Sequence, residues 1–495
     1  MSVILSRMAL GVLVFSLSIN SALALPIDWN GVFGVDTHLL SNTCRTKDTV
    51  TKVPGSGTQG ISGDCGASFQ TYVFKLNPQI IVNDGVTLKG ELSSGFIRGG
   101  FAGSEATNTQ DASGNTGNNS YFFVTPAQRS ALNVNQMYME LYADAALVKL
   151  GRFSKHYGLG SIFDNGTEAW DRFFTMYDGV EAEMKISNFS LIPYWAKISS
   201  FKEPAATSTA SAPSGTFDVR ETGVVAKYDN KNRDLVVSVL YAKRFSERQN
   251  ALYNSSTSHT SAIDRGKTEV TIIDPYISKR WNKFKIAAEF PMLTGDYGNA
   301  YGLTPPENAK ITANAYILEA SYEMNPKWDI GLNGGQVTGD KGSTGKFEGN
   351  YLHPNYQVAE LMFRYRYNAF TEGNENIFNS SITNSRYLKL YANYKTDKWT
   401  WKGAFITANA LETAEAGSDA YHHEENYRFA ATETQADDLG HEVDVGFDYR
   451  WNPNVIISGY YGYWFVGDYY SFSNTATELE VSDVHGGGLR ATLEF

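Results

Sequence analysis

The last residues of the chain, GLRATLEF at positions 488–495, alternate between polar and apolar side chains. Successive side chains of an extended chain point to opposite faces, so the apolar residues of this stretch would share one face. These residues are Leu489, Ala491, Leu493 and Phe495. A period of two indicates a strand with one apolar and one polar face.

The same alternation recurs along most of the chain after residue 24. It is clearest at positions 86–93, 284–292 and 442–449, whereas helical periodicity is weak. The predicted strands are roughly 9–13 residues long, which is enough for a tilted strand to cross a bilayer. The sequence therefore predicts an all-β protein.

The connections between these strands are of two kinds. Eight are tight and rich in Asn, Asp, Gly and Pro, the residues that turns require; they lie at 83–85, 143–145, 187–189, 230–232, 281–283, 325–327, 396–398 and 452–454. Long polar segments, such as 99–131, 199–216, 339–385 and 412–438, lie between them. Short periplasmic turns and long extracellular loops are typical of transmembrane antiparallel β-barrels, and eight turns predict about eighteen strands. Such a sheet must close, because the bilayer offers no partners to free peptide groups.

Tryptophan placement favours the same architecture. Trp281, Trp328, Trp399 and Trp451 all lie at or just after a tight turn. Tryptophan prefers the interface between hydrocarbon and headgroups. We therefore expect these four residues to form one interfacial girdle.

The composition excludes two other classes of protein. The 495 residues are 19% charged, include 30 Tyr and 28 Phe, and carry a net charge of −11. A nucleic-acid-binding protein would need a basic patch, so no nucleic-acid partner is expected. After residue 24 there is no run of about 18 apolar residues, the length that a spanning helix requires.

The first 24 residues are predicted to be a cleaved signal peptide. Arg7 precedes an apolar stretch at positions 8–17, and Ala22-Leu23-Ala24 fits the small-x-small cleavage pattern. Residues 25–495 would then form the barrel. In an exported chain, the two cysteines, Cys44 and Cys65, are expected to form a disulfide. Two thiolates alone would not complete a tetrahedral metal site.

No catalytic motif is found, so we expect neither an enzyme nor a cofactor nor a bound metal. Gly158-Leu159-Gly160 lacks the third glycine and the context of a dinucleotide site. The segment 108–120 is rich in Asp and Asn but lacks the regular ligand positions of an EF-hand. Calcium binding there stays open beside a simple exposed loop.

The strand alternation also predicts which charged residues line the lumen. Lys or Arg on the lipid face would cost about 2–4 kcal/mol at the bilayer midplane, so charges should face inward. The positions assigned to the lumen are Lys75, Lys89, Glu91, Glu140, Lys149, Glu181, Glu183, Lys185, Lys197, Lys227, Lys285, Glu289, Glu319, Lys389, Lys402, Glu442, Asp444, Asp448 and Arg490.

Two long connections stand out. Segment 151–179 is predicted to fold into the lumen as a constriction, with an ordinary surface loop as the alternative; its candidate residues are Arg152, Lys155, His156, Asp164, Glu168, Asp171 and Arg172. Within 339–385, the stretch 353–367 could form a short helix in the mouth, started by Pro354, or a strand. A strand there would break the even count unless a second strand followed at positions 368–385, and a loop is favoured.

The chain resembles alginate-export-like and related bacterial outer-membrane porins. The resemblance rests on positions 150–153, 170–172 and 177–180, which read Leu-Gly-Arg-Phe, Trp-Asp-Arg and Tyr-Asp-Gly-Val, and on the terminal Phe495. It implies an eighteen-stranded barrel in a Gram-negative outer membrane. It also implies that the insertion machinery recognises Phe495 together with Leu489, Ala491 and Leu493. An alginate exporter implies an arginine-rich lumen, whereas the wall predicted here mixes Lys with Glu and Asp.

The sequence thus predicts a passive channel for small hydrophilic solutes or ions. Its expected partners are outer-membrane lipids and the insertion machinery, and assembly into a homotrimer is left open. The alternatives are a surface or structural protein whose lumen is plugged by loops, a substrate-specific polysaccharide export channel, and an outer-membrane enzyme or lipid exporter.

Overall fold

The computed structural model describes residues 27–43, 66–95, 98–101, 132–202, 216–246, 268–298, 309–365, 367, 380–424, 426–475 and 478–495. The predicted signal peptide, both cysteines and segment 108–120 lie outside the described residues. The cleavage, disulfide and calcium hypotheses therefore stay predictions.

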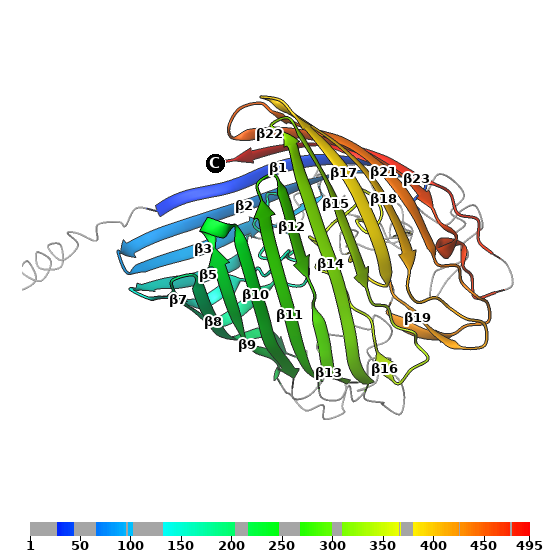
Figure 1. Ribbon diagram of the computed structural model, residues 1–495, viewed down its shortest axis with the longest axis horizontal. Coiled ribbons are helices and arrows are strands. Elements are labelled where there is room, and N and C mark those ends of the chain that lie inside the picture. The colour runs from blue at the N-terminus through cyan, green and yellow to red at the C-terminus, as the bar shows by residue number, and fades with distance from the viewer. Residues whose placement is uncertain are drawn as a thin grey trace, which may run out of the picture.

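The wall is an antiparallel barrel of eighteen strands, as the turn count predicts (Figure 1). The first nine are β1 (Ile27–Ser41), β2 (Ala67–Asn83), β3 (Val86–Ser94) with its continuation β4 (Gly99–Phe101), β5 (Leu132–Ala143), β6 (Ala146–Ser154), β7 (Met176–Ile186), β8 (Phe189–Lys202), β9 (Thr216–Asn230) and β10 (Leu235–Ser246). The other nine are β11 (Thr268–Trp281), β12 (Phe284–Glu289) with its continuation β13 (Met292–Gly298), β14 (Ala309–Asn325), β15 (Trp328–Val337), β17 (Ser385–Lys395), β18 (Trp399–Ala410), β21 (Asp438–Arg450), β22 (Val455–Val466) and β23 (Val484–Glu494).

The sheet closes between its first and last strands. β1 pairs with β2 on one side and with β23 on the other, so that Val35 lies opposite both Tyr72 and Ala491. At the seam, the Gly31 N–H donates to the Phe495 carbonyl oxygen at 2.8 Å. Both ends of the wall thus lie at the end of the barrel where the tight turns are, which we call the turn end. The opposite end is the loop end.

One strand is interrupted within the wall. β12 and β13 both pair with β11 and with β14, so together they occupy one position in the sheet. Pro291 lies in the gap between them. Proline has no N–H to donate, so one ladder hydrogen bond is missing at this position.

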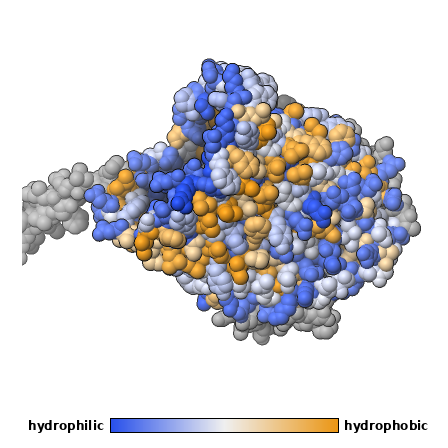
Figure 2. All heavy atoms as spheres, viewed as in Figure 1, coloured by the Kyte–Doolittle hydropathy of each residue, from blue (hydrophilic) through white to orange (hydrophobic). Residues whose placement is uncertain are grey.

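The outward face exposes large apolar side chains, as a bilayer-spanning barrel requires. Ile186 is 77% exposed and Leu489 is 61% exposed. Figure 2 shows apolar side chains gathered across the middle of one face of the molecule. The predicted girdle is present, since Trp281, Trp328 and Trp451 are exposed at the turn end and Trp399 stacks on its neighbour Trp401.

The remaining elements are short and lie mostly at the loop end. They are β16 (Lys346–Phe347), the hairpin of β19 (Asp419–His422) and β20 (Tyr427–Ala430), and two 3-10 turns, η2 (Lys231–Arg233) at the turn end and η3 (Asp468–Ser471). Residues 353–365 form neither a helix nor a strand, which confirms the favoured loop. In the described part of the chain, no helix is long and apolar enough to cross a membrane.

A constriction inside the barrel as the candidate functional site

The connection between β6 and β7, residues 155–175, lies inside the barrel; it is the middle part of segment 151–179, whose two ends belong to β6 and β7. Its Tyr157 hydroxyl donates to the Asp274 carbonyl oxygen on β11 at 2.6 Å. Its Trp170 indole N–H donates to the Thr492 hydroxyl on β23 at 2.8 Å. These strands belong to distant parts of the wall, and a segment that touches the inward face of both must cross the lumen.

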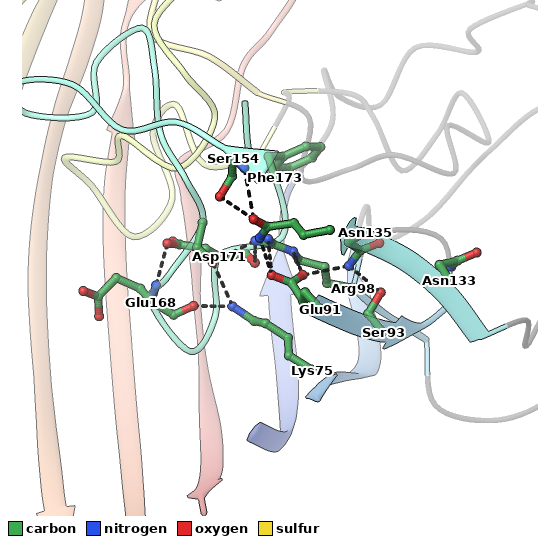
Figure 3. Close-up of polar contacts among 12 residues, drawn as sticks. Lys75, Glu91, Ser93, Arg98, Asn133, Asn135, Ser154, Glu168, Asp171 and Phe173 are labelled. Carbon is green, nitrogen blue, oxygen red and sulfur yellow. Dashed lines mark hydrogen bonds and ion pairs between the residues drawn. The ribbon is translucent and has the colours of Figure 1, made fainter. Parts of the chain in front are cut away.

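Charged residues of β2, of β3 and of the position just before β4 hold one side of this segment (Figure 3). Arg98 is 2% exposed and forms an ion pair with Glu91, with 2.7 Å between Nε and Oε1. The Arg98 guanidinium also donates to the Gly166 carbonyl oxygen at 2.8 Å, and the Lys75 ammonium donates to the same oxygen at 3.2 Å. Both cations of the wall therefore donate hydrogen bonds to a backbone carbonyl oxygen of the segment, and Arg98 also neutralises the Glu91 carboxylate.

A wall carboxylate holds the opposite side of the segment. Glu289 on β12 is fully buried and accepts hydrogen bonds from the Leu159 N–H and the Ser161 hydroxyl. A charged acceptor binds such donors more strongly than a neutral one does. The segment is thus fixed to the wall from two directions.

The described residues of a second segment, 338–365, 367 and 380–384 between β15 and β17, also contribute contacts inside the barrel. Glu442 on β21 is fully buried and accepts hydrogen bonds from three consecutive backbone N–H groups, those of residues 360, 361 and 362, at 3.0, 2.8 and 2.7 Å. The Tyr365 hydroxyl contacts His38 Nδ1 on β1 at 2.8 Å. Leu361 and Met362 are buried in an apolar cluster beneath the wall.

The two segments meet at Asn355. Its amide donates to Asp164 Oδ1 at 2.7 Å and to the Phe173 carbonyl oxygen at 2.8 Å. The His353 N–H donates to the Ser161 carbonyl oxygen at 2.6 Å. The lumen is therefore narrowed by one joined body rather than by two independent loops.

Two spaces remain beside this body. One, of about 170 Å³, is lined by Arg172, Arg364 and Arg490 together with Asp36 and Asp171. The other, of about 350 Å³, shares Arg490 and also has lining from Glu319, Glu360, Lys389, Lys402, Asp444 and Asp448. We call the residues of the smaller space the constriction; three guanidinium groups face two carboxylates there.

Burial changes the protonation of the segment's charged groups. It lowers the pKa of the Lys155 ammonium to about 8, although Glu181 lies 3.3 Å away. It lowers the pKa of Arg172 to about 10, so this guanidinium keeps its charge at neutral pH. Burial and the nearby Asp164 raise the pKa of Asp171 to about 6.

Where the two inserted segments meet, hydrogen bonds shift the pKa of a carboxyl group against the effect of burial. Burial alone would raise the pKa of Asp164, but hydrogen bonds from His156, Asn355 and the Gly166 N–H outweigh it and hold that pKa at about 2. The same contact with Asp164, at 3.2 Å, raises the pKa of His156. Glu168 contributes differently, because its N–H donates to the Asp171 carboxylate while its carbonyl oxygen accepts from Lys75.

The wall residues predicted to face inward largely do so. Ion pairs join Lys89 to Glu140 at 2.9 Å and Lys149 to Glu181 at 3.0 Å. Lys402 pairs with Asp448 at 2.7 Å in the larger space, and Lys285 lies exposed near the turn end. Lys75, Glu289 and Asp444 instead contact the inserted segments, and Glu91 binds Arg98, which contacts them in turn. Many charges expected to line open water therefore hold the constriction in place.

Two assignments were wrong. Arg152 and Lys197 lie on the outward face, where Arg152 pairs with Asp178 at 2.7 Å and Lys197 follows the buried Ala196. Both lie near the loop end of their strands. The cost of a charge on the lipid face falls to about 0–1 kcal/mol near the interface, so charge alone does not assign the face there.

Sequence reasoning missed several residues of the site. Asp36, Trp170 and Arg364 line the constriction, and Arg98 anchors it. Asp36 shares the strand alternation of β1 with other inward residues and could have been assigned from it. Arg364 lies in an irregular segment, where the sequence offers no periodicity.

Comparisons with known proteins give only remote similarity. No family model and no curated protein sequence matches the chain. Among solved structures, it is similar to Pseudomonas aeruginosa OccK8 (OprE), with 9% identity, 94% of this chain and 98% of that chain covered, and a TM-score of 0.48. It is also similar to Pseudomonas aeruginosa OpdK with vanillate (12% identity, 94% and 98% covered, TM-score 0.47) and to a BenF-like porin from Pseudomonas fluorescens Pf-5 (11%, 95% and 99%, TM-score 0.47). None of these three structures is named as an alginate exporter. The barrel of this chain is established by the pairing of its own strands, which closes between β1 and β23.

Proposed function

We propose that the chain is an outer-membrane porin that lets small hydrophilic solutes pass down their own gradient. The observation that carries this proposal is the polar lumen, which holds spaces of about 350 and 170 Å³ that are both lined by Arg490. An outward apolar face and a charged interior are the features of a bilayer-spanning channel. Passage of this kind needs neither a reaction nor a cofactor.

The constriction favours anionic solutes. Arg172, Arg364 and Arg490 line it together with Asp36 and Asp171. Rings of Arg and Lys favour anions in narrow pores. The half-protonated state expected for Asp171 near pH 6 adds to this preference at mildly acid pH.

A plugged barrel with a structural role is the second candidate. The observation that favours it is the apolar packing of the inserted segments, in which Leu361, Met362 and Phe163 are almost fully buried. A body packed in this way could close the lumen permanently. The alginate-export-like resemblance, recognition by the insertion machinery and a homotrimer stay predictions beside both candidates.

Single-channel recording in planar bilayers separates the two. The purified full chain should give stepwise openings, with a reversal potential in a KCl gradient that indicates anion preference. Absence of steps from a correctly folded barrel would contradict the porin and support the plug. Incubation of the barrel with lipids and esters tests for enzymatic turnover, and we expect none.

A further inference from the structure

Asp36 and His38 lie two positions apart on β1 and both project into the barrel. They are 3% and 0% exposed, whereas their neighbours Val35 and Leu39 are 44% and 58% exposed on the outward face. His38 Nε2 lies 2.8 Å from Asp36 Oδ2. A carboxylate that lines the constriction is therefore contacted by an imidazole that lines neither space of the lumen.

The His38 ring is also held at its other nitrogen and on one face. Its Nδ1 lies 2.8 Å from the Tyr365 hydroxyl of the second inserted segment and 2.7 Å from the Tyr460 hydroxyl on β22. The ring stacks on Phe69 of β2, with 4.6 Å between the centroids and 17° between the planes. A change in the orientation of this ring would therefore break contacts with three other elements.

These contacts determine which nitrogen of His38 carries the proton. An ionised carboxylate only accepts hydrogen bonds, whereas a tyrosine hydroxyl can donate one. An imidazole with its proton on Nε2 fits both sides, because Nε2 faces Asp36 and Nδ1 can accept from a tyrosine hydroxyl. The hydroxyls of Tyr365 and Tyr460 lie 3.3 Å apart, so one can donate to the other. His38 thus presents a donor to Asp36.

Asp36 Oδ2 also lies near a guanidinium of the constriction. Arg490 Nη2 is 3.6 Å from this oxygen, farther than His38 Nε2 at 2.8 Å. The other oxygen, Oδ1, accepts a hydrogen bond from the Thr71 hydroxyl. A close guanidinium–carboxylate pair has N–O distances of about 2.7–2.9 Å and often uses both oxygens. Since His38 and Thr71 each contact one oxygen, the pair between Arg490 and Asp36 stays loose.

Arg490 is consequently only partly neutralised by the protein. Its guanidinium lies over the Trp170 ring, 4.2 Å from the centroid, and lines both spaces of the lumen. Within the described part of the chain, its buried Nε has no hydrogen-bond partner. Arg364, by comparison, forms a close ion pair with Glu360. The charge of Arg490 can therefore act on a solute in the constriction.

We propose that His38 is a positioning residue of the constriction, which holds the Asp36 carboxylate so that the Arg490 guanidinium stays available to an anionic solute. Without the imidazole, Asp36 Oδ2 would lose its nearest donor, and the carboxylate could turn to form a close pair with Arg490. A paired guanidinium attracts anions less than a loosely held one, because the carboxylate repels them. The inference rests on the proposed function, since it concerns the ions that the porin admits.

Reversal potentials in a KCl gradient, recorded from single channels of the purified full chain, test the proposal. His38→Leu removes the donor, and the anion-to-cation permeability ratio should fall about threefold, because an ion pair leaves a dipole in place of a charge. His38→Gln places an amide N–H near the position of Nε2 and should keep the ratio of the wild type. His38→Asn places its amide near the position of Nδ1 and should resemble His38→Leu; it also keeps the test valid if the leucine variant assembles poorly.

Asp36→Asn separates positioning from a general effect on the fold. Alone, it should raise the permeability ratio, because a carboxylate that repels anions is gone. Combined with His38→Leu, it should give the same ratio as Asp36→Asn alone, since no carboxylate remains to turn toward Arg490. His441→Leu is the matched control, because His441 stacks on Phe465 at the outward face. Its ratio should equal that of the wild type.

The rate at which Arg490 reacts with butanedione, followed by peptide mass spectrometry, needs no open channel. It should be about threefold lower in His38→Leu than in the wild type or His38→Gln, because a close carboxylate favours the protonated guanidinium, which does not react. An unchanged ratio or rate in His38→Leu, an equal fall in His38→Gln, or a fall that persists with Asp36→Asn would overturn the proposal. Channels that never open, combined with the expected rates, would contradict the porin while leaving the positioning role of His38 standing.

Discussion

Arg152 and Arg172 belong to the same stretch of chain yet lie on opposite sides of the barrel wall. Arg172 lines the constriction, whereas Arg152 pairs with Asp178 on the outward face. The sequence placed both in the lumen because both stand among Gly and aromatic residues. The pair now offers an internal comparison, in which the same chemical change is made inside and outside the channel.

Arg172→Ala should lower the anion preference of the channel. A charge at about 8 Å with an effective dielectric near 20 contributes about 2 kcal/mol, and the loss of half of this would lower the anion-to-cation permeability ratio about fivefold. Arg152→Ala should leave that ratio unchanged. The reversal potential in a KCl gradient measures both, and an equal effect of the two variants would argue against the constriction.

His353 should make the docking of the two inserted segments sensitive to acid. Burial lowers its pKa to about 4, and charges of Asp164, His156 and Arg98 act on it as well. A free histidine has a pKa near 6.5. Between about pH 6.5 and 4, His353 is therefore protonated when the segment is undocked and neutral when it is docked. Docking should therefore weaken as the pH falls from about 6.5 to 4 and be fully stable above that range.

Two other groups at this junction titrate differently. The raised pKa of His156 preserves its contact with Asp164 in acid, and Asp164 itself protonates only near pH 2. Single-channel current noise and limited proteolysis, each measured between pH 4 and 7, would show the loss of docking. In His353→Gln the loss of docking toward acid pH should disappear, since the raised pKa of Asp171 acts in the opposite direction and favours docking as the pH falls. A loss of docking in acid that persists in the variant would assign it to another group.

At the scale of elements, the inserted segments depend on a few carboxylates of the wall. Glu442→Ala would leave the backbone N–H groups of residues 361 and 362 without their acceptor, whereas the N–H of residue 360 would keep its second acceptor, Asp444. Each unsatisfied buried donor costs about 1–3 kcal/mol, so the segment should detach from β21. Larger and noisier single-channel currents are the expected result.

Glu183→Ala is the matched control, because Glu183 accepts a hydrogen bond from the Ser190 hydroxyl of the neighbouring strand. It removes an inward carboxylate without touching either inserted segment. Its currents should equal those of the wild type. Were the Glu442 variant to behave identically, the segment would not depend on this anchor.

These elements also show what sequence can and cannot predict here. Strand alternation identified the inward positions of Glu289, Glu442 and Arg490, because the period of two depends only on neighbouring residues. The bonds that Glu442 forms with residues 360–362 join positions about 80 residues apart in irregular chain. No local pattern encodes such a pairing, so the path of residues 338–384 could not be predicted.

At the scale of the whole molecule, the terminal residue closes the sheet and was predicted to direct assembly. Phe495 is 49% exposed on the outward face, and its backbone pairs with Gly31. Phe495→Ala should lower the yield of assembled barrel while leaving the thermal stability of the assembled fraction nearly unchanged, since the backbone bonds remain. Heat-dependent electrophoretic mobility measures both quantities, and an unchanged yield would contradict an assembly role for the ring.

The seam itself has a wider consequence. Because Ile27 and Phe495 lie at the same end of the barrel on adjoining strands, a short peptide could join them, and the ring could be cut at another tight turn, such as 396–398. Such a circular permutant would keep every wall pairing but would end on β17 instead of β23. If this permutant assembles, the wall pairings are sufficient for closure of the barrel. If it does not, assembly depends on an aromatic residue at the end of the chain.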